Sequence, residues 1–154
     1  MDASSASRRE WLRVLAMADP SRLSAEWDRW LLKPEVEAVR GPETGLVMVR
    51  GRIGAGGDRF NMGEATVSRA TLRLRHPALA AELVGEAHVL GSDTRHAWLA
   101  AVFDGLLSDD GQRADVLRTV VEPLRAEQEQ RDARRRGEAS GTRVDFFTMA
   151  RETS

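Results

Sequence analysis

A regular alternation of apolar and charged residues from Thr66 to Arg75 constrains the fold of this chain more than any other feature. The apolar positions are Ala70, Leu72 and Leu74, and the positions between them hold Val67, Arg69, Thr71, Arg73 and Arg75. Successive side chains of a β-strand point to opposite faces, so the pattern predicts a strand with one face on a core and one in water. Antiparallel sheets commonly have one such wet face.

Three further segments have the composition of strands: Glu35–Arg40, Leu46–Ile53 and Leu83–Leu90. The turn-forming residues 41–45 separate the first two, and the glycine-rich residues 54–58 follow the second. A phosphate-binding loop would need a Lys-Ser/Thr pair opening a helix, which is absent, so residues 54–58 predict a plain hairpin loop. Together the segments predict an antiparallel sheet of about four strands with helices on one face.

Helices are predicted on both sides of the strand region. Ser7-Arg8-Arg9-Glu10 has the spacing of a capping box and predicts a first helix over about residues 7–18. Asp19-Pro20 predicts the start of a second helix, which Pro34 ends. Ser92 or Asp93 caps a third helix, whose apolar residues recur at three- and four-residue spacing up to Leu107.

The C-terminal third changes character twice. Val116–Leu124 predicts a fourth helix, which we expect Pro123 to kink or interrupt. Residues 125–141 are polar on every side and predict a solvated helix or a spacer. Apolar residues return after it, and the tail either fills the chain's own core or, as we favour, docks on another subunit. The proposed contacts are Val144, Phe146, Phe147 and Met149.

The predicted organisation is a single α+β domain over residues 1–141 and an interface tail over residues 142–154. With a net charge of −1, the chain has no global attraction to nucleic acid or an anionic membrane. The absence of cysteine excludes disulfides, thiolate metal ligands and iron–sulfur ligation on this chain. No signal peptide or long apolar run is visible, so we expect a cytoplasmic protein.

Candidate functional residues fall into two sets. The first set is an arginine face, which is either a solvated sheet face or a surface for a polyphosphate or an acidic partner. Its members are Arg50, Arg52, Arg69, Arg73 and Arg75. The second set is the histidines His76, His88 and His96, for which a structural or surface role is favoured, because no carboxylates accompany them at a metal-binding spacing. No metal site is predicted.

Four blocks of sequence resemble the PhnG family, the G subunit of carbon–phosphorus lyase. They are residues 40–52 (Arg-Gly-Pro-Glu-Thr-Gly-Leu-Val-Met-Val-Arg-Gly-Arg), 60–70, 91–97 and 144–149. Their order and spacing agree over essentially the whole chain. The departures are small: Ser92 stands where the family often has Arg, and Ala150 where it often has Val.

The resemblance implies a subunit of a cytoplasmic core complex that contains H, I and J subunits and a second copy of this chain. With an ATPase-like L subunit, that system transfers the ribose triphosphate of ATP to a phosphonate and releases adenine. The iron–sulfur cluster of the later bond-breaking step is expected on another subunit, and no cofactor on this one. Two rivals remain: a purely structural scaffold, and an enzyme in its own right with Glu43, Glu64, Arg69 and His96 converging on a nucleotide.

Overall fold

The computed structural model describes residues 3–54 and 56–141. For residues 3–7 and 139–141 it describes the backbone alone. The predicted α+β class is confirmed. In chain order the elements are α1 Ala3–Ala16, α2 Pro20–Arg29, β1 Glu35–Arg52, β2 Arg59–Arg75, β3 Leu83–Leu90, α3 Thr94–Ser108, α4 Asp110–Val116, the π-helical turn η1 Leu117–Val121, and α5 Glu122–Gly141.

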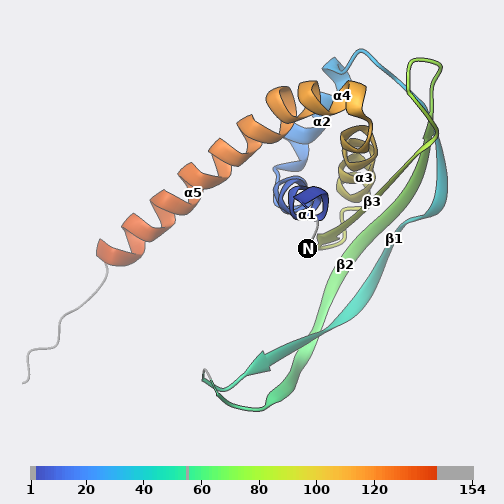
Figure 1. Cartoon of the computed structure of the whole chain (residues 1–154). Helices are drawn as coiled ribbons and strands as arrows, with labels where there is room; N and C mark the ends of the chain where they lie inside the picture. The colour runs from blue at the N-terminus through green and yellow to red at the C-terminus, as the bar shows by residue number, and fades with distance from the viewer. Residues whose placement is uncertain (1–2, 55, 142–154) are drawn as a thin grey trace, which may run out of the picture.

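The sheet is antiparallel in the order β1-β2-β3, and the helices lie on one of its faces, as predicted (Figure 1). The predicted number of about four strands is wrong, because the described sheet has three. Residues 41–45 form no turn. The pairing of β1 with β2 passes from Arg40↔Thr71 to Glu43↔Arg69, so Gly41 and Pro42 are absorbed as a bulge within one long strand.

Glycine is required at position 41 of this bulge. Its φ of 69° lies in the left-handed region, and a Cβ there would come within 2.6 Å of the carbonyl oxygen of Arg69. Strand β2 begins at Arg59 rather than at Thr66, so it is long enough to pair with both halves of β1. The predicted loop of residues 54–58 does connect β1 to β2.

The core lies between the sheet and α3. Alternate residues of β2 and β3 are buried beneath this helix, among them Leu72, Leu74 and Ala87. The predicted apolar face of β2 is thereby confirmed. Helix α3 approaches β3 closely at Gly85, where a Cβ would overlap the carbonyl oxygen of Ala101. On the other side of α3, the ring of Trp27 packs edge-to-face against Phe103.

The helix starts were predicted with mixed success. Asp19 caps α2 by accepting from the backbone N–H of Ser21 at 2.8 Å, and Asp93 caps α3 by accepting from that of His96 at 2.9 Å. The capping box at Ser7 is wrong, since α1 already begins at Ala3. Helix α2 ends at Arg29, before Pro34.

Pro123 falls where a helix changes its winding. It has no N–H to donate, and its ring crowds the carbonyl four residues earlier. The π-helical turn Leu117–Val121 ends two residues before it. The polar segment beyond it is helical in α5, whose 20 residues span about 30 Å and lead away from the sheet (Figure 1). The predicted tail of residues 142–154 lies outside the described residues. No described helix has the length and apolar character to cross a membrane.

Candidate functional site

The most distinctive surface of the molecule is a two-stranded arm formed by Leu46–Thr66. Strand β3 pairs with β2 only as far as Leu90↔Val67, whereas β1 and β2 remain paired to Arg52↔Arg59. The arm therefore continues for about 23 Å beyond the third strand. Figure 1 shows it leaving the helices behind, and no described residue within it is buried.

The base of the arm is marked by the buried hydroxyl group of Ser68. Ser68, which is fully buried, donates to the carbonyl oxygen of Gly91 at 2.9 Å, and its hydroxyl lies 3.1 Å from that of Thr44. These bonds tie the end of β3 to the first two strands. The core ends there, and the outer part of the hairpin is covered neither by a third strand nor by the helices.

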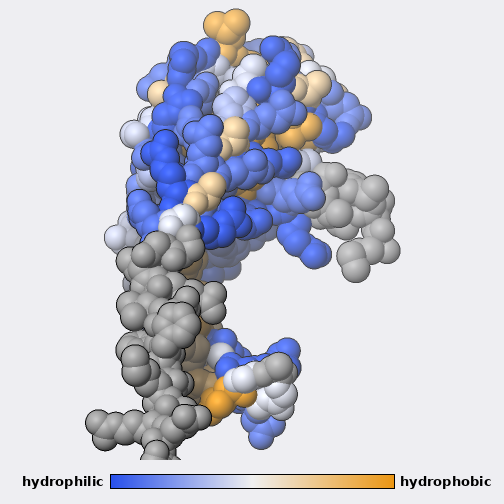
Figure 2. Space-filling model, turned by 90° about the vertical axis from the view of Figure 1, so that its left-hand side faces the viewer, coloured by the Kyte–Doolittle hydropathy of each residue, from blue (hydrophilic) through white to orange (hydrophobic). Residues whose placement is uncertain are grey.

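The arm is apolar although it is exposed. Leu46 and Met62 each have 65% of their surface exposed, and the other exposed large apolar side chains on the arm are Val47, Met48, Val49, Ile53 and Phe60. Hydrophobic surface on the arm stands apart from the largely hydrophilic body in Figure 2. A two-stranded hairpin is at best marginally stable in water, and a contiguous apolar patch marks an interaction site. The arm is therefore a candidate assembly surface.

The predicted arginine face divides between two places. Arg50 and Arg52 lie near the tip of the arm, paired with Asn61 and Arg59, whereas Arg69, Arg73 and Arg75 lie on the body of the sheet. On the body the arginines point away from the helices, as predicted from the alternation. The two groups do not form one continuous patch.

Carboxylates of this chain already contact the arginines on the body. Arg69 bonds Glu43 at 2.8 Å, Arg73 bonds Glu82 at 2.9 Å, and Arg75 bonds Glu82 at 2.6 Å. Glu37 also contacts Arg73 and Arg75. Hydrogen bonds from Arg40 and Arg69 lower the pKa of the Glu43 carboxyl. Binding of an external anion by this face stays a prediction, and such an anion would compete with these carboxylates.

The four residues proposed to converge on a nucleotide are brought together only in part. Glu43 and Arg69 are in contact. Glu64 pairs with Met48 in the arm, five residues and about 17 Å along β2 from Arg69. His96 is buried on the helical side, with its Nε2 2.8 Å from the carbonyl oxygen of Leu15. The favoured structural role fits His96.

A buried carboxylate that the sequence did not indicate joins α1, β3 and α3. Asp104 is 1% exposed and accepts from Arg8 at 2.7 Å and 3.1 Å, from Trp11 Nε1 at 2.9 Å, and from the backbone N–H of Glu86 at 2.9 Å. The last bond caps an amide at the edge of the sheet. Capping of this kind limits the pairing of that edge with another chain.

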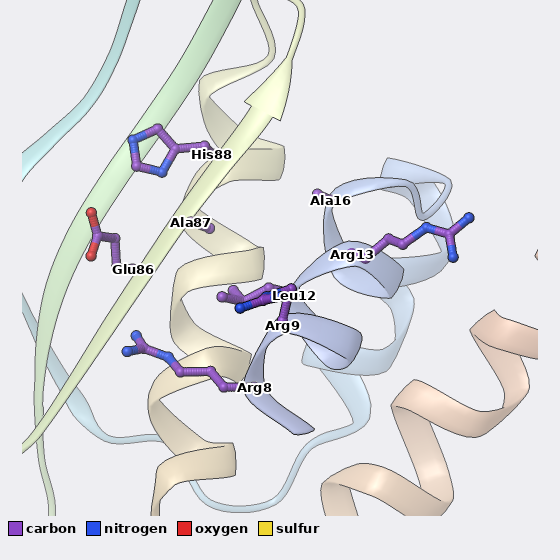
Figure 3. Close-up of a pocket in the computed structure, with 8 residues that line it drawn as sticks. All are labelled: Arg8, Arg9, Leu12, Arg13, Ala16, Glu86, Ala87 and His88. Carbon is purple, nitrogen blue, oxygen red and sulfur yellow. The ribbon is translucent and has the colours of Figure 1, made fainter. Parts of the chain in front are cut away.

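A groove of about 550 Å³ runs between α1 and β3 beside this carboxylate (Figure 3). It is lined by Arg8, Arg9 and Arg13, by Glu86 and His88, and by the apolar residues Leu12, Ala16 and Ala87. In Figure 3, Arg8 extends toward β3, Arg13 points away from it, and His88 projects from the strand on the side away from α1. The arginine side chains do not converge on one point, so the groove is an open depression with charged residues at its rim and not an enclosed site.

The comparisons with known proteins agree with the resemblance seen in the sequence. A family profile described as phosphonate metabolism protein PhnG matches residues 6–152. An alpha-D-ribose 1-methylphosphonate 5-triphosphate synthase subunit PhnG from Rhizobium meliloti (strain 1021) is 52% identical over 150 residues, which are 97% of this chain and 92% of that protein. The chain belongs to the PhnG family of phosphonate metabolism proteins.

Proposed function

We propose that this chain is a subunit of an alpha-D-ribose 1-methylphosphonate 5-triphosphate synthase in phosphonate catabolism and works only within that assembly. The observation that carries the proposal is the 52% identity with a subunit of that name, which extends over 97% of this chain. Because the similarity also covers 92% of the relative, it reflects the whole subunit rather than one shared domain.

The geometry supports an assembly role over a self-contained active site. Glu64 and His96 lie apart from the Glu43–Arg69 pair, and the described residues contain no cluster of three or more possible metal ligands. The apolar arm, in contrast, has the composition of a subunit contact. In this proposal the H, I and J subunits are the partners in the core complex, the chain supports the I subunit, and the L subunit joins in the reaction.

In the proposed reaction the complex transfers the ribose triphosphate of ATP to a phosphonate and adenine leaves. ATP is a substrate of the complex, this chain holds no cofactor, and the iron–sulfur cluster belongs to another subunit. The test is co-expression of the H, I, J and L subunits with and without this chain, followed by chromatographic measurement of adenine released from ATP and methylphosphonate. We expect release only when the chain is present, and none from the chain alone. Equal release without it would overturn the proposal.

A direct part in the chemistry is the second candidate, and the contact between Glu43 and Arg69 is the observation that favours it. Glu43→Gln and the pair Arg69→Ala with Arg73→Ala remove charge from the outer face without touching the core. A complex that assembles normally but releases no adenine would place these side chains in the reaction. If the variants change neither assembly nor adenine release, the chain has a structural role only and the arginine face is a solvated surface.

A further inference from the structure

We infer that the arm, Leu46–Thr66, inserts into a cleft of a different subunit that covers both of its faces and presents carboxylates to its tip. This inference rests on the proposed function, because it requires that the chain be part of a complex. It goes further by assigning the contact to one segment and by stating the chemistry of the partner surface.

The distribution of apolar side chains requires cover on both faces. Thr44 pairs with the buried Ser68, so it lies on the helical face of the sheet. By the two-residue period of a strand, Leu46 and Met48 continue that face, and Val47 and Val49 occupy the opposite one. A flat partner would leave one pair of side chains in water. A cleft covers both pairs.

The tip of the arm is built for close packing. Met62 and Phe60 lie over Gly51, where a Cβ would come 2.9 Å from Cγ of Met62 and 3.5 Å from the Phe60 ring. The two side chains cross from β2 to β1 and fill the space that the glycine leaves. Aromatic residues and methionine are enriched in interface cores.

The charges near the tip specify the partner further. Arg50, Arg52 and Arg59 lie there, and the described residues provide none of the three with a carboxylate within bonding distance. On the body of the same sheet, in contrast, Arg69, Arg73 and Arg75 are all paired. Guanidinium groups that leave water in an interface require hydrogen-bond acceptors, and between protein chains the carboxylate is the acceptor that also neutralises their charge. The partner cleft must supply them.

A second copy of this chain fits these requirements poorly. Its groove between α1 and β3 is lined by three arginines and one carboxylate, Glu86, so the net positive charge of the groove would repel the arginines of the arm. Its groove beside α2 contains Glu26 and Asp115, but these carboxylates are already paired with Arg29 and Arg118. Side-by-side packing of two arms would cover one face of each. The geometry points to a chain of different sequence.

Site-specific photocrosslinking tests the location of the contact. The photoreactive residue p-benzoylphenylalanine replaces Met48 or Val47, which lie on opposite faces, in the chain co-expressed with the H, I and J subunits. We expect both positions to crosslink to the same non-identical subunit, with peptides identified by mass spectrometry on two walls of one cleft. Crosslinks to another copy of this chain, or from one face only, would overturn the inference.

Charge reversal tests the chemistry of the tip. The triple variant Arg50→Glu, Arg52→Glu and Arg59→Glu should reduce the yield of co-purified partner at least tenfold. The matched control replaces the same three residues by lysine, keeps the charge, and should retain most of the yield. Circular dichroism and tryptophan fluorescence verify the fold, because none of the four tryptophans lies in the arm. A glutamate variant that assembles at the wild-type yield contradicts the inference.

These outcomes separate the inference from the proposed function. A wild-type chain that joins no H, I or J subunit would end both. A complex that requires this chain, yet forms at full yield with the glutamate variant or gives arm crosslinks only between copies, would end the inference alone.

Discussion

Removal of the buried carboxylate of Asp104 should destabilise the body of the protein more than removal of any exposed carboxylate. In Asp104→Ala, Trp11 Nε1 and the backbone N–H of Glu86 both lose their acceptor. A buried donor left without a partner costs about 1–3 kcal/mol. Arg8 also loses its carboxylate, but 47% of its side chain is exposed, so water replaces part of that contact.

Together these losses amount to about 2–5 kcal/mol, with the larger share from the buried indole N–H of Trp11 and the smaller from the part-buried amide of Glu86. A loss of this size is a large fraction of the stability of a domain. Arg8→Ala should cost less, because the carboxylate keeps its bonds to Trp11 and Glu86. The ranking Asp104→Ala above Arg8→Ala is therefore part of the prediction.

The assay is urea unfolding of the purified complex and of the free chain, followed by tryptophan fluorescence. Asp110→Ala is the matched control, since that carboxylate is 91% exposed and its bond to Arg113 should contribute less than about 1 kcal/mol. If the unfolding free energy of Asp104→Ala lies within about 1 kcal/mol of the wild-type value, the reasoning that this carboxylate fastens α1 to the edge of the sheet is refuted.

Three further predictions concern packing, pH and the tail. Gly85→Ala should lower the free energy of unfolding by about 3 kcal/mol or more, because the added methyl group meets the backbone of Ala101. The control Gly45→Ala has open space around the added methyl group, so its melting temperature should lie within a few degrees of the wild-type value. Hydrogen bonds from Arg40 and Arg69 lower the pKa of the Glu43 carboxyl below its ordinary value of 4.5. The stability that this carboxylate contributes to the folded state is therefore present above pH 4.5 and is lost as the pH falls through the pKa of the folded state. The melting temperatures of wild type and Glu43→Gln should converge in acid. Phe146→Ala with Phe147→Ala should lower co-purification with the core subunits while circular dichroism stays unchanged, and co-purification at the wild-type yield would disprove a docked tail.

The sequence predicts those parts of the fold in which local pattern and tertiary structure agree. The bounds Leu83–Leu90 of β3 are as predicted, because apolar residues alternate along it and Gly91 ends it. The caps at Asp19 and Asp93 also follow from local chemistry, since each carboxylate bonds an amide two or three residues away. Such bonds need no knowledge of the rest of the chain.

Features that depend on distant residues were missed. Gly41-Pro42 has the composition of a turn, but β2 is long enough to pair on both sides of it, and it becomes a bulge within β1. Asp104 lies in an apolar helix, and its donors come from residues 18 to 96 positions away in the sequence. Periodicity along α3 cannot reveal such partners.

The candidate site was predicted by residue type rather than by place. Five arginines were predicted and Arg59 was missed. Those on the body are paired because Glu37, Glu43 and Glu82 lie beside them, and among the described residues no carboxylate lies within bonding distance of those on the arm. One signal of the arm was visible: Leu46–Val49 is apolar at every position, which differs from the alternation of a strand with one wet face. Such a run is typical of a strand covered on both faces, and the described chain covers neither.

Native mass spectrometry of an armless chain tests the central claim most directly. Leu46 and Thr66 pair across the hairpin, so replacing residues 47–65 by Asn-Gly should close it with a two-residue turn and leave the core intact. Co-expressed with the H, I and J subunits, the wild-type chain should appear in a complex of mixed subunits, and the armless chain should appear folded and free. An armless chain found in the complex at the wild-type stoichiometry would contradict the account.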